Sequence, residues 1–158
     1  MSQMLMMYNS VGNAAFSQMI GQIAPFFATI NAQFVALKPN YAEITMPFCR
    51  EVTNHLGTVH AIAMCNMAEL VAGSMTDASL PNGFRWIPKG MTVEYLAKAK
   101  TDLRAIANGE GIDWHSAGDV VVPVDVFDTQ QQKVFTARIT MNIKTGDLVL
   151  GEHVQQVI

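Results

Sequence analysis

The chain has 158 residues, a length that fits one domain. Half of its residues are hydrophobic and 15% are charged, against about 25% charged in ordinary soluble domains. This composition excludes a disordered chain and a charged coiled coil. The net charge of −3 gives no general attraction to nucleic acid or to an anionic membrane, so we expect neither as a partner.

The first 37 residues contain no Asp, Glu, Lys, Arg or His. A signal peptide needs a positively charged start and a membrane span needs about 20 nearly unbroken apolar residues, and this segment has neither feature. Its apolar residues recur at helical spacing, at Phe16, Ile20, Ile23, Phe27 and Ile30. We predict a packing helix over 11–30, bent or restarted at Pro25, with a helix lying on a membrane surface as the alternative.

The two cysteines, Cys49 and Cys65, form neither a C-x-x-C motif nor a metal-binding spacing. Sparse thiols without a secretory signal favour a cytoplasmic protein in which both are structural, and a single disulfide is the alternative. Asp113, His115 and Asp119 resemble a metal-binding cluster only loosely, so we expect no metal site.

Short strands surround one long apolar segment in the rest of the chain. The predicted strands are residues 33–38, 41–48, 85–99, 102–108, 119–128, 133–144 and 148–157. A helix is predicted over 58–78, capped at Thr58 or at Asn54. We therefore predict an α+β fold in which one antiparallel sheet covers one helix. The single domain consists of an N-terminal helical extension, 1–32, and a core, 33–158.

The central helix is apolar nearly all round, which indicates burial in a core. Glu69 lies in the middle of this helix, and its carboxylate is costly to bury unless it is paired or hydrogen-bonded. Glu69 is therefore the leading candidate for a functional residue. A glutamate at the solvent edge of the helix is the alternative.

A motif before this helix and a triplet within it belong together. The motif N-x-x-G-x-x-H falls on Asn54, Gly57 and His60, and the triplet is Met67-Ala68-Glu69. This pattern resembles the hotdog-fold acyl-CoA thioesterases, and most of all the phenylacetate-degradation thioesterases and their uncharacterised relatives. The resemblance extends over about residues 41–144, and 91–99 is similar to the third strand of that family. The family often has two glycines after the histidine, where this chain has Ala61-Ile62.

The resemblance implies a hotdog fold, with an antiparallel sheet wrapped around the helix, and hydrolysis of an acyl thioester of coenzyme A or of an acyl carrier, without a cofactor. It implies that the Asn54 side chain and the Ala61 backbone N–H polarise the thioester carbonyl. Amides at a helix start suit a developing oxyanion. Glu69 would act as general base on water or as nucleophile. His60 would orient the loop or cap the helix, or else exchange protons in the reaction.

Helix geometry limits how such a site can be assembled. Positions 61 and 69 are eight residues apart, which is about 12 Å along a helix axis. One chain therefore cannot easily bring the Ala61 amide and Glu69 to the same carbonyl. Two chains packed antiparallel would do so and would create two sites, as in the thioesterases that the chain resembles. We predict a homodimer or a homotetramer.

Several other residues are candidates for substrate binding. Gly57 lies in the motif, and Asn66 could hydrogen-bond Glu69 or water, or be a structural amide. Relatives can have a hydroxyl one turn after the acid, where this chain has Gly73. Five basic residues could meet the phosphates of coenzyme A, or simply be solvated: Arg85, Lys89, Lys98, Lys100 and Arg104.

Two other functions compete with thioester hydrolysis. Hydroxyacyl dehydratases of the same superfamily use a loop histidine and a helix acid, which His55 and Glu69 could supply. The usual Pro- and Gly-rich segment between these residues is missing, which ranks dehydration below hydrolysis. The second alternative is a non-catalytic acyl-binding module in which Glu69 only organises the dimer.

Overall fold

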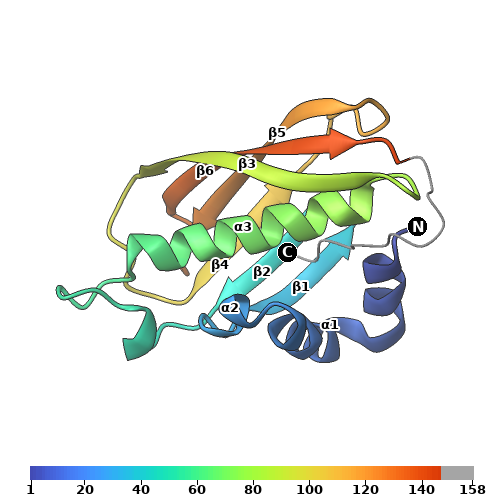
Figure 1. The fold of residues 1–158 in the computed structure, drawn as a ribbon. Helices are drawn as coiled ribbons and strands as arrows, with labels where there is room; N and C mark the ends of the chain where they lie inside the picture. Colours follow the sequence, from blue (N-terminus) through green and yellow to red (C-terminus); the bar gives the residue numbers. More distant parts are fainter. Residues whose placement is uncertain (147–158) are drawn as a thin grey trace.

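The computed structural model describes residues 1–146, which form one antiparallel sheet packed on a long helix, with further helices beside it (Figure 1). The helices are α1 (Gln3–Ile23), α2 (Pro25–Ala28) and α3 (Ala61–Ser79), and η1 (Arg50–Val52) is a single 3₁₀ turn. The strands are β1 (Gln33–Lys38), β2 (Tyr41–Met46), β3 (Arg85–Tyr95), β4 (Leu103–Asn108), β5 (Gly118–Phe127) and β6 (Lys133–Lys144).

The strand order is β1-β2-β4-β5-β6-β3, and every strand contacts α3. Alternation along the strands sends one set of side chains toward the helix, such as Ala42, Ile44 and Met46 of β2, which are buried. They pack with Met67 and Met75 of α3 in the core. The predicted fold class, a hotdog fold with an additional N-terminal helix, is confirmed. The predicted strands 33–38 and 133–144 match β1 and β6, and the strand predicted at 148–157 lies outside the described residues.

The N-terminal helix begins earlier than predicted. The Ser2 hydroxyl accepts a hydrogen bond from the Leu5 amide at 3.0 Å and caps α1, so the prediction of a start at residue 11 is wrong. Gly12 has a φ of 81° and interrupts the helix with a kink, which can be followed in Figure 1. The kink resets the helical spacing, which explains why the apolar spacing predicts only the second half of the helix. The predicted restart at Pro25 is confirmed by α2.

The central helix begins at Ala61, three residues later than predicted. Its cap is His60, whose Nδ1 accepts a hydrogen bond from the Ile62 amide at 3.0 Å. The predicted caps, Thr58 and Asn54, instead bond to one another within the preceding turn. Residues 58–60 stay extended because Val59 bridges Thr53 and its amide donates to the Ala99 carbonyl at 2.8 Å.

The two edges of the sheet differ. Along β1, the side chains of α1 pair with the strand backbone: the Ser17 hydroxyl accepts from the Phe34 amide at 2.8 Å, and Asn13 Nδ2 donates to the Val35 carbonyl at 3.2 Å. At the other edge, β3 pairs with β6 on one side and with no described residue on the other. Within residues 1–146, β3 is therefore the one edge whose backbone groups are free for another strand.

Candidate functional site

The loop before α3 is built around the Asn54 side chain. Asn54 Oδ1 accepts hydrogen bonds from the amides of Leu56 (2.9 Å) and Thr58 (3.2 Å), and Nδ2 donates to the Thr58 hydroxyl at 3.0 Å. Gly57 closes the turn with a φ of 77°, a conformation that favours glycine. Because the Asn54 amide nitrogen carries two hydrogens, one of them remains after the bond to Thr58.

His60 and Ala61 form the start of α3. His60 Nδ1 is an acceptor in the capping bond, so the proton of the neutral ring lies on Nε2. The amides of Ala63 and Met64 both donate to the His60 carbonyl, whereas the Ala61 amide donates to no group in residues 1–146. The motif therefore places a free N–H beside the Asn54 loop, at the positive end of the helix dipole.

Glu69 lies two turns further along α3 and is half-buried. Its carboxylate forms no hydrogen bond or ion pair with the described residues. At 1.5 Å per residue, it is displaced from Ala61 by about 12 Å along the axis. It shares an outward strip of α3 with Ile62, which is 56% exposed, and with Cys65. Burial raises the pKa of the Cys65 thiol. One chain brings Asn54, His60 and Ala61 together and keeps Glu69 apart from them.

Asn66 points toward the N-terminal extension. Its Nδ2 donates to the Phe26 carbonyl and to the Thr29 hydroxyl, both at 3.4 Å. The side chain is buried, and its Oδ1 has no hydrogen-bond partner. The bond from Asn66 to Glu69 that the spacing suggested is not formed, because α2 takes the amide instead.

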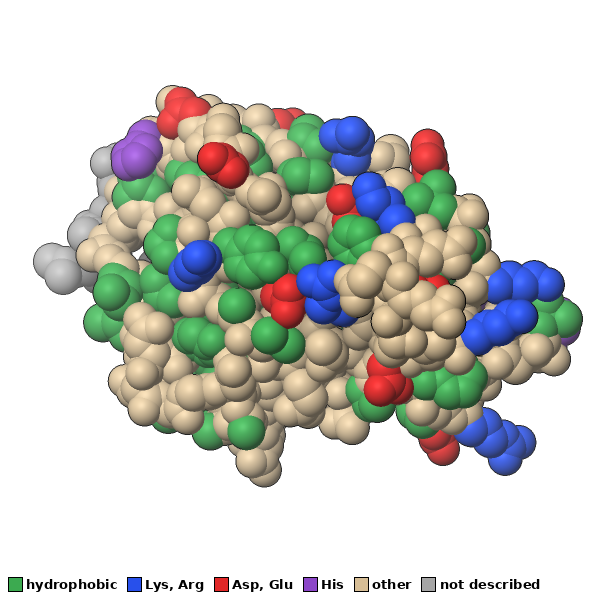
Figure 2. Space-filling view, turned by 180° about the vertical axis from the view of Figure 1, so that it is seen from behind, with side chains coloured by type: hydrophobic (Ala, Val, Ile, Leu, Met, Phe, Trp, Pro, Cys, Tyr) green, Lys and Arg blue, Asp and Glu red, His purple; other side chains and the backbone are tan. Residues whose placement is uncertain are grey.

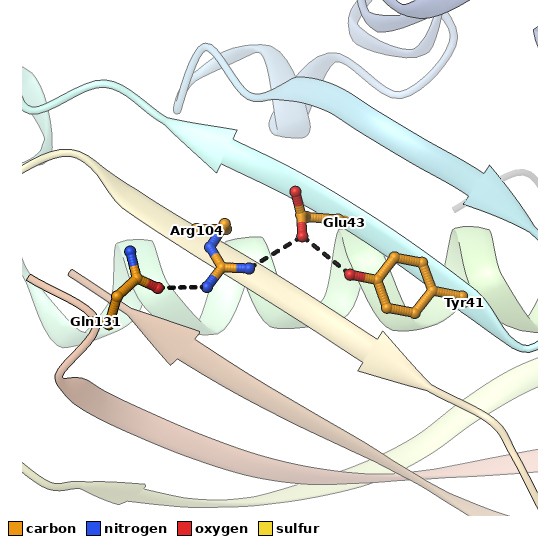
Figure 3. Close-up of polar contacts among 4 residues, drawn as sticks. All are labelled: Tyr41, Glu43, Arg104 and Gln131. Carbon is orange, nitrogen blue, oxygen red and sulfur yellow. Dashed lines mark hydrogen bonds and ion pairs between the residues drawn. The ribbon is translucent and has the colours of Figure 1, made fainter. Parts of the chain in front are cut away.

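Two of the predicted phosphate contacts are engaged elsewhere in the sheet. Lys89 pairs with Asp119 at 2.8 Å, and the hydrogen bond from Lys89 lowers the pKa of Asp119. Arg104 pairs with Glu43 at 3.1 Å and donates to Gln131 at 2.7 Å (Figure 3).

Tyr41 completes the network in Figure 3 by donating to Glu43 at 2.9 Å, and burial together with this bond raises the pKa of Tyr41. Arg104 is therefore part of a chain of hydrogen bonds that runs from Gln131 to Tyr41 on the face of the sheet opposite α3.

The other basic candidates are exposed at opposite ends of β3. Lys98 and Lys100 form no ion pair with residues 1–146. They flank Ala99, whose carbonyl accepts a hydrogen bond from the Val59 amide, two residues before Ala61. Arg85 begins β3, and at about 3.3 Å per residue the strand separates it from Tyr95 by roughly 33 Å.

Asp77 is a site-like residue that the pattern did not single out. It lies in the last turns of α3, where it accepts a hydrogen bond from Trp86 Nε1 at 3.2 Å and another from Ser2. Burial raises the pKa of this carboxyl. Its partners come from β3 and from the residue before α1, so no local motif marks it.

The described residues contain neither a metal-type cluster nor a spanning helix. No three His, Cys, Asp or Glu side chains of residues 1–146 are grouped as metal ligands. Asp113 instead accepts from the His115 amide and the Ser116 hydroxyl within its own turn. No described helix is long and apolar enough to cross a membrane.

Comparison with known proteins gives the family and the fold. Residues 12–143 match the family described as Domain of unknown function (DUF4442). A protein solved in structural genomics is 60% identical, with a TM-score of 0.84 over 91% of this chain and 97% of that one. No curated protein matches the sequence.

More distant structures share the fold. A probable thioesterase of unknown function from Pseudomonas aeruginosa is 21% identical, with a TM-score of 0.72 over 82% of this chain and 93% of its own. A thioesterase from Haemophilus influenzae is 16% identical, with a TM-score of 0.72 over 87% and 94%. At these identities the likeness establishes the hotdog fold.

Proposed function

Because the chain belongs to the DUF4442 family and shares the hotdog fold with solved thioesterases, we propose that it is a cytoplasmic enzyme that hydrolyses an acyl thioester of coenzyme A or of an acyl carrier. The observation that carries the proposal is a pair of unengaged groups on α3: the Ala61 amide at its start, and the Glu69 carboxylate about 12 Å along it. One is a donor for a carbonyl oxygen, and the other is a base.

The two groups act on one substrate if two copies of the chain pair antiparallel through β3. The free edge of β3 supports this arrangement, and Met91 and Tyr95 next to it are exposed although their cross-strand partners Ile139 and Phe135 are buried. The pairing sets the Ala61 amide of one chain opposite the partner's Glu69. The resulting homodimer has two equivalent sites, and two such dimers could form a tetramer.

In each site the thioester oxygen accepts hydrogen bonds from the remaining Asn54 Nδ2 hydrogen and from the Ala61 amide. Glu69 either removes a proton from a water molecule that attacks the carbonyl carbon or attacks that carbon itself. When water attacks, collapse of the oxyanion breaks the carbon–sulfur bond and releases the free acid, and the thiolate takes the proton that Glu69 removed from the water. When Glu69 attacks, collapse releases the thiolate, which takes a proton from water, and leaves a mixed anhydride on Glu69 that a water molecule then hydrolyses to the free acid. His60 holds the start of α3 through its capping bond, and the Gly57 turn holds Asn54.

The phosphates of coenzyme A are assigned to exposed cations. Lys98 and Lys100 flank Ala99, whose carbonyl bonds the Val59 amide just before α3. Antiparallel pairing lays the start of the partner strand beside the end of β3, so the partner's Arg85 joins them. Lys89 contributes only if the substrate displaces Asp119, with which it is paired.

Thiol release from a panel of acyl-CoA substrates tests the proposal. Glu69→Gln should lower kcat by about 10²-fold or more, the usual loss for a general base. Glu110→Gln, which removes an exposed carboxylate from a loop, should leave kcat within twofold. If no acyl-CoA of the panel, whatever its chain length, releases thiol, the proposal is refuted.

The same assays identify the alternatives. Thermal stabilisation by acyl-CoA without turnover would indicate a binding module. Hydration of crotonyl-CoA without thiol release would indicate a dehydratase that uses His55 and Glu69. His55 is exposed in the turn before α3.

A further inference from the structure

A cavity of about 410 Å³ lies between α1, α2 and β1 and reaches α3 at Leu70. Its buried lining residues, which include Phe27, Phe34 and Leu70, are apolar except for Ser17, while the polar residues Gln18, Gln22, Asn31 and Gln33 lie at its exposed margin. None of the described residues that line it is charged. The volume falls within the range of about 300–1,000 Å³ that is usual for small-molecule pockets. The lining suits a neutral, largely apolar group.

The two helices that bound the cavity are held differently. α1 is fixed to the edge of β1 by the Ser17 and Asn13 hydrogen bonds, at 2.8 and 3.2 Å. α2 is held to α3 by two longer bonds from Asn66, both 3.4 Å, which leave Asn66 Oδ1 buried and unpartnered. An unsatisfied buried acceptor opposes the seated position of α2. α2 is therefore attached to α3 by longer hydrogen bonds than those that attach α1 to β1.

The cavity adjoins the proposed base. Leu70 follows Glu69 in sequence, and Asn66 lies one turn before Leu70 on the same flank of α3. Gly73 lies one turn beyond both Glu69 and Leu70 and is buried. On this flank of α3, the residues between Glu69 and the cavity are therefore Asn66, which contacts α2, and the small residue Gly73.

We infer that α1 and α2 form the pocket for the acyl chain, which leaves Glu69 around this flank of α3 and ends in the cavity. The inference rests on the proposed thioesterase function and adds the substrate class. That class is a neutral acyl chain of medium length, on the order of ten carbons if each group occupies about 30 Å³. A chain that ends in a carboxylate is disfavoured, because no lining residue offers a positive charge.

The segment without charges is the one that builds this pocket. Figure 1 shows α1 and α2 beside β1, and in Figure 2, seen from behind, the corresponding lower left part of the molecule shows neither red nor blue side chains. The absence of charge before Lys38 follows from this role.

Two neighbouring alanines of α1 provide a matched test. Both are exposed, but Ala14 lines the cavity and Ala15 does not. We would measure kcat/KM for saturated acyl-CoA substrates of 2 to 14 carbons in the wild-type protein, in Ala14→Phe and in Ala15→Phe. Wild-type kcat/KM should rise by about fourfold for each methylene group buried. Ala14→Phe should lose at least tenfold on decanoyl-CoA and less than twofold on acetyl-CoA, and Ala15→Phe should match the wild type.

A binding measurement separates this inference from the proposed function. If no substrate is hydrolysed, the function fails, and calorimetric binding of S-decyl-CoA, a non-hydrolysable thioether, still tests the pocket. If Ala14→Phe binds S-decyl-CoA at least tenfold more weakly than the wild type and Ala15→Phe does not, the pocket is supported. A flat chain-length profile, equal effects of the two substitutions, or equal activity on decanoyl-CoA and its ω-carboxyl analogue overturns the pocket even if hydrolysis is confirmed.

Discussion

Replacement of Phe16 by alanine tests whether α1 is an integral part of the fold. The Phe16 side chain is fully buried, and its ring meets Tyr8 and Phe34 edge-on, with centroids 5.3 and 4.8 Å apart. Buried Phe-to-Ala changes cost about 3–5 kcal/mol. The better helix propensity of alanine returns roughly 0.5 kcal/mol. We therefore expect the free energy of unfolding to fall by about 3–4 kcal/mol in Phe16→Ala.

Urea unfolding followed by circular dichroism measures this loss, with all proteins at one concentration because self-association raises apparent stability. The expected fall in Tm is roughly 6–16 °C for a chain of this size. Met6→Ala provides the control, since Met6 is 47% exposed on the same helix and its loss should change stability by no more than about 0.5 kcal/mol. A loss below about 1 kcal/mol in Phe16→Ala would show that α1 is not seated on β1 and would refute the reasoning.

Two further predictions concern the buried acid and the free strand edge. Burial raises the pKa of Asp77, so the folded state binds its proton more readily than the unfolded state, and this group adds stability as the pH falls through the raised pKa. Asp77→Asn should therefore be more stable than the wild type at pH 7, and urea unfolding between pH 7 and pH 4 should show the difference shrinking; a constant difference would contradict this. Met91→Asp should place a charge beside the free edge of β3 and convert the proposed homodimer to monomers in analytical ultracentrifugation, with loss of the proposed thiol release. Val121→Asp, at a β5 position that is 48% exposed against 36% for Met91, should leave that dimer intact, and equal dissociation of both variants would argue against pairing through β3.

Strands such as β2 and β4 were predictable because their burial alternates from one residue to the next. β2 alternates between half-buried and buried residues along its whole length, and the Pro39-Asn40 turn before it has Asn40 at a φ of 67°. The start of α1 was missed because its signals are a single hydroxyl, Ser2, and a pair of buried residues before the kink at Gly12. A change of helical phase at one glycine cannot be recognised from apolar spacing alone.

The part of the candidate site that lies within one short stretch of sequence was predictable. Asn54, Gly57 and His60 lie within seven positions, and the structure brings them to the start of α3. The choice of cap was wrong because the extended bridge from Val59 to Thr53 competes with an earlier helix start. The ion-pair partners of the basic residues were not predictable, because Arg104 pairs with Glu43, which is 61 positions away in the sequence. Only the register of β2 with β4 brings these two side chains together.

The unequal edges of the sheet explain why pairing through β3 would stop at a closed dimer. A sheet with two free edges can add copies without limit, whereas pairing through one edge about a two-fold axis closes after two. In this chain Asn13 and Ser17 of α1 bond the Val35 carbonyl and the Phe34 amide of β1, and Phe16 packs on Phe34 of the same strand. A charged side chain in their place would have to be desolvated against the strand. The uncharged N-terminal segment thus covers one edge, and the other stays free for the proposed pairing, which would bring Ala61 and the partner's Glu69 to one substrate.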